Sequence, residues 1–337
     1  MTPLPFAHGG PPLAGILRAV PEDFEVDEVL GFEPEGQGEH AFVRIEKRDA
    51  NTEWVARRLA DVLGIEPVAV GFSGLKDRHA LTRQTFSVHL PGRPDPDWHA
   101  LAIEGVRVLD AVRHTRKLKR GAHRGNRFCI RLREVSGDVA ETGRMLALIA
   151  AHGVPNYFGA QRFGRNGDNL RAAHALFSGA RLGRSQRAFA LSAARSQLFN
   201  EVLARRVRDA TWNSALDGEV WMLAGSHSIF GPQDHDAEIL RRLGDGDIDP
   251  TGPLWGRGEL RSAGAVREIE AAAAQADEAF ASGLARADLR QERRALRLRA
   301  DGMRPVWEDQ TTLRLEFALP SGTFATALVR EICNTGE

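Results

Sequence analysis

Residues 68–90 read VAVGFSGLKDRHALTRQTFSVHL, a stretch that carries both a structural and a chemical signal. An apolar run over residues 68–72 ends at Ser73-Gly74, and Phe86, Val88 and Leu90 then alternate with polar residues. A short apolar run closed by glycine and a strict alternation are both typical of β-strands. We therefore predict two strands, one on each side of residues 73–84.

Strand patterns continue on both sides of this stretch. Residues 24–29 and 41–46 alternate approximately, as half-buried strands do, and helical spacing replaces the alternation between residues 51 and 63. Residues 127–133 alternate Arg or Cys with Phe, Ile or Leu. This last strand should have one apolar face and one cationic face that suits phosphate.

The chain returns to the strand pattern at its end, after a long helical part. Residues 153–304 are rich in Ala, Arg and Leu and include a helical segment over residues 264–300, whereas residues 313–319 alternate again. Such an apolar terminal strand needs a sheet to join, and the nearest one is that of the first third. We therefore predict a discontinuous domain of residues 1–152 and 305–337 with an insertion between its parts.

The composition is that of an ordinary soluble protein. The 337 residues are 42% hydrophobic and 27% charged, and the formal net charge is zero. This length favours two domains, since single cores stop growing at roughly 250–300 residues. Residues 1–6 lack a signal-peptide pattern and no apolar run approaches the ~20 residues of a membrane span, so we expect a cytoplasmic protein without a membrane partner.

Positive charge is concentrated in one segment despite the neutral total. Between Arg113 and Arg133 there is no acidic residue, and the basic ones are Arg113, Arg116, Lys117, Lys119, Arg120, Arg124, Arg127 and Arg131. Arg162, Arg165 and Arg171 form a second cluster at the start of the insertion. Such clusters neutralise phosphates without reading sequence, although a solvated charged face is the commoner outcome. A groove between the two domains is the hypothesis that these clusters favour.

Asp77 is the strongest candidate for chemistry in the loop between the two predicted strands. Lys76 and Arg78 flank it in the sequence, and nearby cations favour the ionised carboxylate, which is a competent nucleophile. The charge pattern alone favours an exposed turn whose ion pair would contribute only about 0–1 kcal/mol. A Walker-type phosphate loop is excluded, because Gly74-Leu75-Lys76 lacks the upstream glycine and the following Ser or Thr.

The segment around Asp77 closely resembles the aspartate motif of the TruD family of tRNA pseudouridine synthases, which runs Gly-x-Lys-Asp followed by Thr and Gln. Further segments resemble that family in the same order along the chain. These are Pro21-Glu22-Asp23-Phe24, Gly125-Asn126-Arg127-Phe128, residues 156–164 (NYFGAQRFG) and residues 319–325 (LPSGTFA). Together they cover the chain nearly end to end, and ordered multiple matches are far more specific than one short motif.

The resemblance implies a fold and a set of roles. The fold would be α+β, a pseudouridine synthase catalytic domain with a mixed, mainly antiparallel sheet, plus an inserted α-rich TRUD domain over residues 153–304. Asp77 would be the nucleophile, Asn126 would hold Asp77 or the base, and Phe128 would stack on a flipped uracil. The further substrate-binding residues would be Lys76, Phe24 and Phe324. The residues expected at the RNA backbone are Arg116, Lys117, Lys119, Arg120, Arg124, Arg162 and Arg165.

Without the resemblance, each of these residues has an ordinary structural reading. Phe24, Phe128 and Phe324 have the spacing of core residues, and Asn126 could cap a turn. One point favours the family: other pseudouridine synthases place a Tyr beside the aspartate, the TruD family uses Phe, and the only tyrosine here, Tyr157, is outside the catalytic segments.

The resemblance implies isomerisation of one tRNA uridine, at position 13, by a monomer that uses no cofactor. We expect no metal, because the two cysteines have no C-x-x-C spacing, and no calcium loop, because Asp245, Asp247 and Asp249 lack the later ligands. The dinucleotide fingerprint is also missing. Two alternatives stay open: a noncatalytic RNA-binding protein with the synthase fold, and a hydrolase, which would need a second carboxylate that residues 71–84 do not supply.

Overall fold

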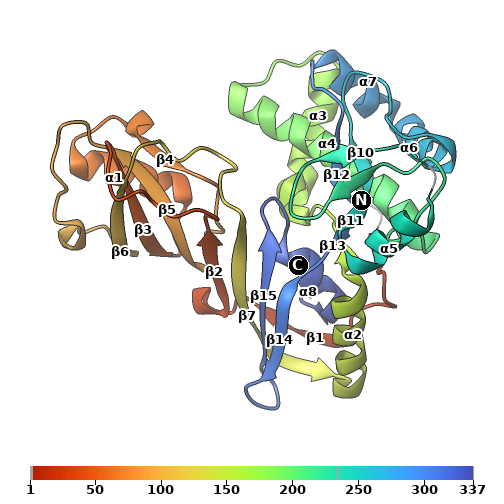
Figure 1. Cartoon of the computed structure of the whole chain (residues 1–337), viewed down its shortest axis with the longest axis horizontal. Helices are drawn as coiled ribbons and strands as arrows, with labels where there is room; N and C mark the ends of the chain where they lie inside the picture. Colours follow the sequence, from red (N-terminus) through yellow and green to blue (C-terminus); the bar gives the residue numbers. More distant parts are fainter. Residues whose placement is uncertain (1–2, 234, 337) are drawn as a thin grey trace.

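The computed structural model describes residues 3–233 and 235–336, which form a large sheet, a smaller sheet and eight helices (Figure 1). The ten strands of the large sheet are β1 (Leu13–Leu17), β2 (Phe24–Val29), β3 (His40–Arg48), β4 (Val70–Phe72), β5 (Leu81–His89), β6 (Val106–His114), β7 (Gly125–Gly137), β14 (Asp301–Trp307), β15 (Leu313–Pro320) and β16 (Cys333–Asn334). The helices are α1 (Thr52–Leu63), α2 (Val139–His152), α3 (Asp168–Phe177), α4 (Arg184–Arg208), α5 (Ala237–Asp245), α6 (Gly264–Ala276), α7 (Glu278–Arg286) and α8 (Ala325–Ile332).

The large sheet has the main order β14-β15-β7-β2-β5-β3-β6, with β1 beside β7 and β4 beside β5. The pairs β2–β5 and β1–β16 are parallel, and the other pairs of this sheet are antiparallel. A mixed, mainly antiparallel sheet in an α+β fold is thereby confirmed. Strand β15 pairs with β7 along its whole length, from Leu313 opposite Leu132 to Pro320 opposite Gly125. The end of the chain therefore joins the sheet of the first third, as predicted.

The two strands predicted around the Asp77 loop are present, but the loop is shorter than expected. Strand β5 begins at Leu81, so the connection from β4 spans only residues 73–80. Thr82 lies opposite Val26 of β2 on one side and Lys47 of β3 on the other. Residues 81–84 looked like a loop because they are polar, although they face neighbouring strands on both sides.

The middle of the chain forms α3–α7 and the smaller sheet, whose order is β10-β9-β11-β12. Its strands are β9 (Trp221–Leu223), β10 (Ile229–Phe230), β11 (Ile248–Leu254) and β12 (Glu292–Ala295). The prediction of a helical segment over residues 264–300 is wrong beyond Arg286, where α7 ends. The backbone of β12 pairs with β11, and this tertiary pairing outweighs the helix propensity of its Glu, Arg and Ala residues.

The chain enters and leaves this middle part at one place. Strand β8 (Val154–Pro155) pairs with β13 (Arg297–Leu298), so the two connecting segments lie side by side. In Figure 1 the middle part forms a separate lobe that meets the large sheet near β13 and α8. Strand β14 runs across the boundary expected at residues 304–305. No helix in the described part of the chain is long and apolar enough to cross a membrane.

Replacement of Leu315 by Ala should destabilise the large sheet, because this β15 side chain is fully buried under α8 and α2. We expect the free energy of unfolding to fall by about 2–5 kcal/mol in a urea titration. The matched control is Val306→Ala on the neighbouring strand β14, where 38% of the side chain is exposed and the effect should stay within about 0.5 kcal/mol. Equal effects of the two substitutions would contradict the role of β15 as a core strand.

Candidate active site

The candidate site lies on one face of the large sheet, between two apolar cores. Helix α1 buries Val55 and Leu59 over one end of this face, and α2 and α8 bury Met145 and Leu328 over the other. The strip between them has no helix above it. Loop 73–80 lies there instead, since backbone oxygens of Gly74 and Asp77 accept hydrogen bonds from side chains of the sheet.

Strand register places polar residues side by side on this strip. Asn126 of β7 lies opposite Glu28 of β2. Two residues earlier on β2, Val26 lies opposite Thr82 of β5, and Thr82 lies opposite Lys47 of β3 on its other side. All five side chains are buried. Polar groups in the middle of a buried sheet face are costly unless they find partners, so the loop and any ligand must supply them.

The first anchor of the loop is the Glu28 carboxylate. Its Oε2 atom accepts hydrogen bonds from Ser73 Oγ at 2.6 Å and from Lys76 Nζ at 2.7 Å, and its Oε1 atom accepts one from the Thr85 amide at 3.1 Å. Only 5% of the Lys76 side chain and none of the Glu28 side chain is exposed. Lys76 is therefore held beneath the loop, with its charge directed at Glu28.

The second anchor is Thr52, the first residue of α1. Its hydroxyl accepts a hydrogen bond from the Lys76 amide at 3.0 Å and donates one to Gln84 Oε1 at 2.9 Å. The amide of the Gln84 side chain in turn donates to the Gly74 carbonyl at 3.3 Å. With a helix, a strand and the loop joined in this way, the position of Asp77 is set before any ligand binds.

Asp77 presents its carboxylate at the surface of this assembly. Its side chain is 36% exposed, its Oδ2 atom lies 3.7 Å from the Arg18 guanidinium, and its backbone oxygen accepts a hydrogen bond of 2.9 Å from Lys47 Nζ. Burial lowers the pKa of Lys47 from 10.5 to about 8, although the Asp77 and Asp49 carboxylates oppose this effect. Two cations from other strands and turns therefore face the residue.

The expectation that Lys76 and Arg78 provide the charge next to Asp77 is wrong. Lys76 pairs with Glu28, and Arg78 Nε lies 3.9 Å from a carboxylate oxygen of Asp49. Neighbours in an irregular loop point in different directions, so adjacency in sequence did not indicate proximity in space. Asp49 also lies 2.9 Å from the His79 ring.

Arg18 connects the carboxylate to the aromatic residues. Its backbone has a φ of 60°, a left-handed conformation that costs a residue other than glycine about 1–2 kcal/mol. The guanidinium lies 4.0 Å from the centre of the Phe24 ring, and Phe24 meets Phe128 edge to face at 6.1 Å. Asp77, Arg18, Phe24 and Phe128 thus form one continuous series of contacts.

Two buried polar atoms on the strip have no hydrogen-bond partner among the described residues. They are Asn126 Oδ1 and Thr82 Oγ1. Both lie next to the Phe128–Val26 pair of the strip. Thr82 of β5 lies opposite Val26, and Asn126 lies two residues before Phe128 on β7. Unsatisfied buried polar groups are rare in folded proteins and call for an explanation, and a bound polar molecule would provide one.

Phe324 belongs to a different group of side chains. It precedes α8, its ring centre lies 6.0 Å from that of Phe158, and it faces the guanidinium of Arg162 at 5.6 Å. The segment that carries it leaves the sheet beside Asn126, which lies opposite Leu319. The structure thus links Asp77, Phe24 and Phe128 through a series of contacts and places Asn126 beside them by strand register. It puts Phe324 in the adjoining lobe junction.

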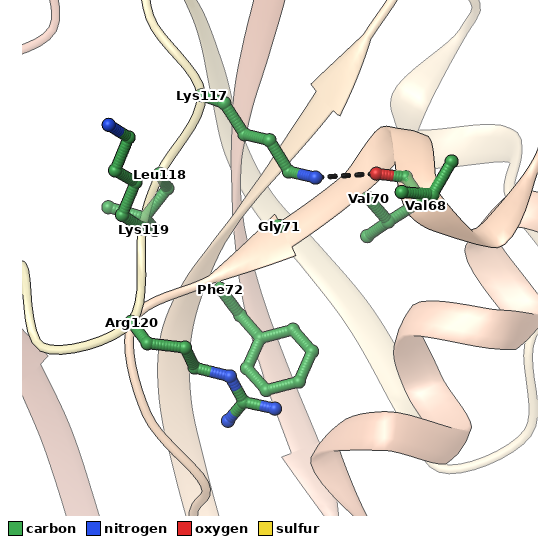
Figure 2. Close-up of a pocket in the computed structure, with 8 residues that line it drawn as sticks. All are labelled: Val68, Val70, Gly71, Phe72, Lys117, Leu118, Lys119 and Arg120. Atoms are coloured by element: carbon green, nitrogen blue, oxygen red, sulfur yellow. Dashed lines mark hydrogen bonds between the residues drawn. The ribbon is translucent and has the colours of Figure 1, made fainter.

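The basic segment borders a hollow of about 410 Å³ with a largely apolar floor, which Figure 2 shows. The lining residues are Val68, Val70, Gly71, Phe72, Lys117, Leu118, Lys119 and Arg120. A Cβ atom on Gly71 would lie 2.6 Å from the Leu118 carbonyl, so only glycine lets the basic segment pack this closely on β4. The Gly121 amide also donates to the Ser73 carbonyl at 2.7 Å, which ties this segment to the Asp77 loop.

The cations of this segment are of two kinds. Lys117 donates to the Val68 carbonyl, and Arg120 lies 3.9 Å from the centre of the Phe72 ring (Figure 2). Arg120 also pairs with Glu53 at 3.4 Å. Arg113 likewise pairs with Asp95 at 3.1 Å. By contrast, four cations of the segment are exposed and have no ion pair within the described ranges: Arg116, Lys119, Arg124 and Arg127. Arg165, in the second basic cluster, is exposed in the same way.

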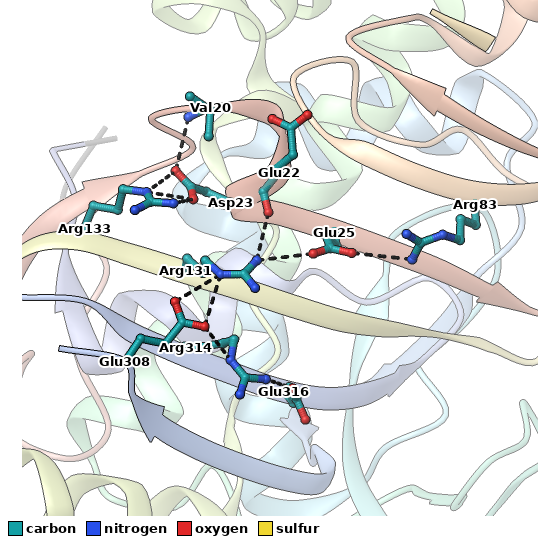
Figure 3. A network of polar contacts seen from close by, with 10 residues as sticks. All are labelled: Val20, Glu22, Asp23, Glu25, Arg83, Arg131, Arg133, Glu308, Arg314 and Glu316. Carbon is teal, nitrogen blue, oxygen red and sulfur yellow. Dashed lines mark hydrogen bonds and ion pairs between the residues drawn. The ribbon is translucent and has the colours of Figure 1, made fainter. Parts of the chain in front are cut away.

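The opposite face of the sheet carries less free positive charge than its sequence suggested. Arg131 pairs with Glu25 and with Glu308, both at 3.2 Å, and Arg133 pairs with Asp23 at 2.7 Å (Figure 3). These acids lie in the turn before β2, on β2 and on the β14–β15 connection, whereas Arg127 of β7 is exposed and has no ion pair in the described part of the chain. The expectation that this face suits phosphate is therefore wrong for Arg131 and Arg133.

No group of three or more His, Cys, Asp or Glu side chains within the described ranges is arranged to hold a metal ion. Cys129 and Cys333 are both free, and burial raises the pKa of each thiol. The chemistry available on the strip is therefore that of a carboxylate, two cations, an amide and aromatic rings.

Comparison with known proteins identifies the family to which this chain belongs. The family model described as tRNA pseudouridine synthase D (TruD) matches residues 4–179 and 167–332. The chain belongs to the TruD family. This membership confirms the family resemblance and the enzyme class that the sequence indicated.

Individual TruD proteins match nearly the whole chain. A tRNA pseudouridine synthase D of Xanthomonas campestris is 49% identical over 344 residues, covering 98% of this chain and 94% of that protein. One of Chromohalobacter salexigens is 49% identical over 334 residues, covering 97% and 95%. A crystal structure of a TruD protein from Methanosarcina mazei has the same fold, with a TM-score of 0.72 at 22% identity and coverage of 97% and 95%.

Three residues of this candidate site were missed in the sequence. Arg18 and Lys47 face Asp77 from β1–β2 and β3, and Glu28 holds Lys76. Arg18 could have been suspected, since it stands three residues before the Pro21-Glu22-Asp23-Phe24 segment. Lys47 and Glu28 gave no local signal, because each occupies a position that resembles the solvent-facing side of an alternating strand.

The buried Lys47 should make stability depend on pH. Its pKa is about 8 in the folded protein and near 10.5 when unfolded, so the unfolded chain binds more protons between these values. Stability should therefore rise with pH from about 8 to about 10.5, relative to a Lys47→Met variant, by an amount on the order of 1–3 kcal/mol. Below pH 8 the difference between the two proteins should be constant.

The measurement is urea unfolding of both proteins at several pH values across this window. Lys117→Met, which removes a half-buried lysine of the basic segment, is the control and should track the wild type. If the wild type and Lys47→Met curves stay parallel from pH 8 to 10.5, Lys47 is not buried in its charged form as described.

Proposed function

We propose that this TruD protein converts one uridine of a tRNA, the one at position 13, to pseudouridine, with Asp77 as the nucleophile. Isomerisation changes neither the composition nor the oxidation state of the nucleotide, so the reaction needs no cofactor. The observation that carries the proposal is the partly exposed Asp77 carboxylate beside Arg18, at the edge of a strip that combines phenylalanine rings with unsatisfied polar atoms.

The strip suits a pyrimidine that has been turned out of the RNA stack. Everting a base costs a few kcal/mol, which backbone contacts and pocket contacts offset. Phe128 would offer its ring to the uracil, and Asn126 Oδ1 would accept a hydrogen bond from the N3–H group of the base. Phe24 would support Phe128 from behind, since their rings meet edge to face at 6.1 Å.

The reaction would proceed through a covalent intermediate. A carboxylate oxygen of Asp77 attacks ribose C1′, most simply, and the C1′–N1 bond breaks so that uracil leaves as an anion. The freed uracil rotates, C5 attacks C1′, and Asp77 is released. Proton transfer from C5 and to N1 completes the balance. A retaining glycosidase uses its carboxylate on a sugar carbon in the same way, whereas attack at uracil C6 is the alternative first step.

Arg18 and Lys47 would have separate tasks in this sequence. Arg18 would orient the carboxylate from 3.7 Å, and Lys47 would hold the backbone of Asp77 through its 2.9 Å hydrogen bond. Lys76 contributes from below through Glu28, so its role is to position the loop. Phe324 would reach the substrate from the lobe junction.

The two lobes would divide the work. In this proposal residues 1–152 and 305–337 form the catalytic domain, residues 153–304 form the inserted TRUD domain, and a cytoplasmic monomer binds tRNA between them. The backbone contacts would come from Arg116, Lys117, Lys119, Arg120 and Arg124 on one side and from Arg162 and Arg165 on the other.

Replacement of Asp77 by Asn should abolish turnover and leave RNA binding intact. Removal of a catalytic nucleophile lowers rates by a factor on the order of 10⁴ or more. The assay is tritium release from tRNA labelled at C5 of uridine, combined with a filter-binding titration of the same RNA. Asp61→Asn on the exposed side of α1 is the matched control and should retain full activity.

The outcomes separate the candidate functions. Turnover by the Asp77→Asn protein would refute the nucleophile, and tight binding without tritium release by the wild type would favour a noncatalytic RNA-binding protein. Release of free uracil by the wild type would favour a hydrolase. Only loss of tritium release with unchanged affinity supports the proposal.

Neutralisation of Arg116 and Lys119 together should weaken tRNA binding and flatten its salt dependence. Both are exposed and unpaired within the described residues, so the double Gln variant should reduce the slope of log affinity against log salt by about 2. The charge-matched control is Arg267→Gln with Arg286→Gln on α6 and α7, which should leave the slope unchanged. An unchanged slope in the Arg116 and Lys119 variant would show that the RNA docks elsewhere.

A further inference from the structure

Two arginines that have no acidic partner among the described residues meet at the junction of the lobes. Arg294 belongs to β12 of the smaller sheet, and Arg162 lies in the 3-10 turn Ala160–Phe163. Both guanidinium groups face the rings of Phe158 and Phe324, at 4.3 and 6.0 Å for Arg294 and at 5.2 and 5.6 Å for Arg162. Two like charges therefore share one pair of aromatic rings.

Arg294 is fixed by neutral acceptors alone. It donates to the Asn156 side-chain oxygen at 2.6 Å, to the Asn156 carbonyl at 3.4 Å and to the Gly322 carbonyl at 2.8 Å. These bonds use three of its five N–H groups, and two remain. Burial, together with the charge of Arg162, lowers the pKa of Arg294 to about 9. The group is therefore held rigidly in a charged form that its surroundings disfavour.

Arg162 has fewer bonds and the same lack of negative charge. Its one hydrogen bond to the described protein goes to Ser192 Oγ at 2.9 Å, and burial lowers its pKa. No acidic side chain in the described part of the chain forms an ion pair with either arginine. The adjacent N-terminus of α8 adds to the positive charge, because its first turn has no acidic residue and its N-cap, Phe324, accepts no side-chain hydrogen bond.

A purely structural reading leaves this charge unexplained. Arg294 does connect β12 with the segment after β15, but a neutral side chain could make such a bond without the cost of a buried cation. Other buried arginines of this chain do have acids: Arg206 pairs with Glu219 at 2.8 Å and Arg293 with Glu270 at 2.6 Å. The unneutralised pair is partly open to solvent, so a ligand can supply the missing anion.

We propose that Arg162 and Arg294 together hold one phosphodiester of the RNA, with the Phe324 ring against the sugar or base of the same nucleotide. The remaining N–H groups of the two guanidinium planes match the two non-bridging oxygens of a phosphodiester. This proposal rests on the proposed function only in taking RNA as the ligand. It adds an anchoring point at the lobe junction, distinct from the exposed cations of the basic segment.

The site would set the register of the RNA on the sheet. Phe324 follows the end of β15, where Leu319 lies opposite Asn126, so a phosphate held here is close along the chain path to the strip that carries Phe128. A nucleotide anchored at the junction would thus adjoin the everted uridine and fix its approach to Asp77.

The test is a binding cycle that uses transcripts with one neutral methylphosphonate linkage at each position around the target uridine. Binding is measured in the Asp77→Asn background, so that no RNA is converted. Arg162→Gln should weaken binding of unmodified RNA about 10-fold to 100-fold and lower the salt slope by about 1. A methylphosphonate at one position of the RNA should weaken its binding to the Asp77→Asn parent by a similar factor. The same methylphosphonate should have little further effect on the affinity of the Arg162→Gln protein.

Matched variants keep the test specific. Arg294→Lys retains a charge but not the planar fork, and it should lose less affinity than Arg294→Gln, with both melting temperatures checked against the parent. Arg267→Gln is the surface control and should stay sensitive to every linkage. The phosphate site would be overturned if, at every linkage position, the affinity losses caused by the methylphosphonate and by Arg162→Gln simply added. Unchanged affinity of a folded Arg162→Gln protein would overturn it as well. Turnover of the wild type, measured separately by tritium release, tells this failure apart from failure of the proposed function.

Discussion

The buried ion pair between Lys76 and Glu28 is the constraint on which the site depends. Its 2.7 Å contact lies beneath loop 73–80, and removing one partner of such a pair typically costs about 3–5 kcal/mol because a charge is left uncompensated. The pair holds the loop over a strip of the sheet that no helix covers. Asp77, one residue further along, can therefore project its carboxylate toward solvent from a loop whose backbone is hydrogen-bonded to the sheet and to α1.

This arrangement also explains how charge is distributed in a chain whose total charge is zero. Acids on the outer face of the sheet neutralise Arg131 and Arg133, and acids in the middle lobe neutralise Arg206 and Arg293. Positive charge stays unmatched, within the described residues, mainly along the basic segment beside β4 and at the lobe junction. A polyanion would meet these two places, and the segment beside β4 is bonded directly to the Asp77 loop through the Ser73 carbonyl.

Much of the fold could be predicted from alternation alone. The apolar residues from Leu313 onward required a sheet, and β15 does join β7. The failures share one cause, which is that long-range pairing overrides local pattern. Residues 292–295 and 297–298 include good helix formers but pair as strands, and Lys76 and Arg78 flank Asp77 in sequence but turn to Glu28 and Asp49. The cations that do face Asp77 come from positions 18 and 47, where no local motif marks them.

The central claim is that Asp77 attacks a uridine presented on the strip between the two cores. The most direct measurement is a crystal structure of the Asp77→Asn variant with a tRNA that carries the unmodified uridine. The account predicts that ribose C1′ lies about 3–3.5 Å from the side chain at position 77, with the uracil against the Phe128 ring. A uridine still stacked in its helix, or bound on the outer face beside Arg131, would contradict it.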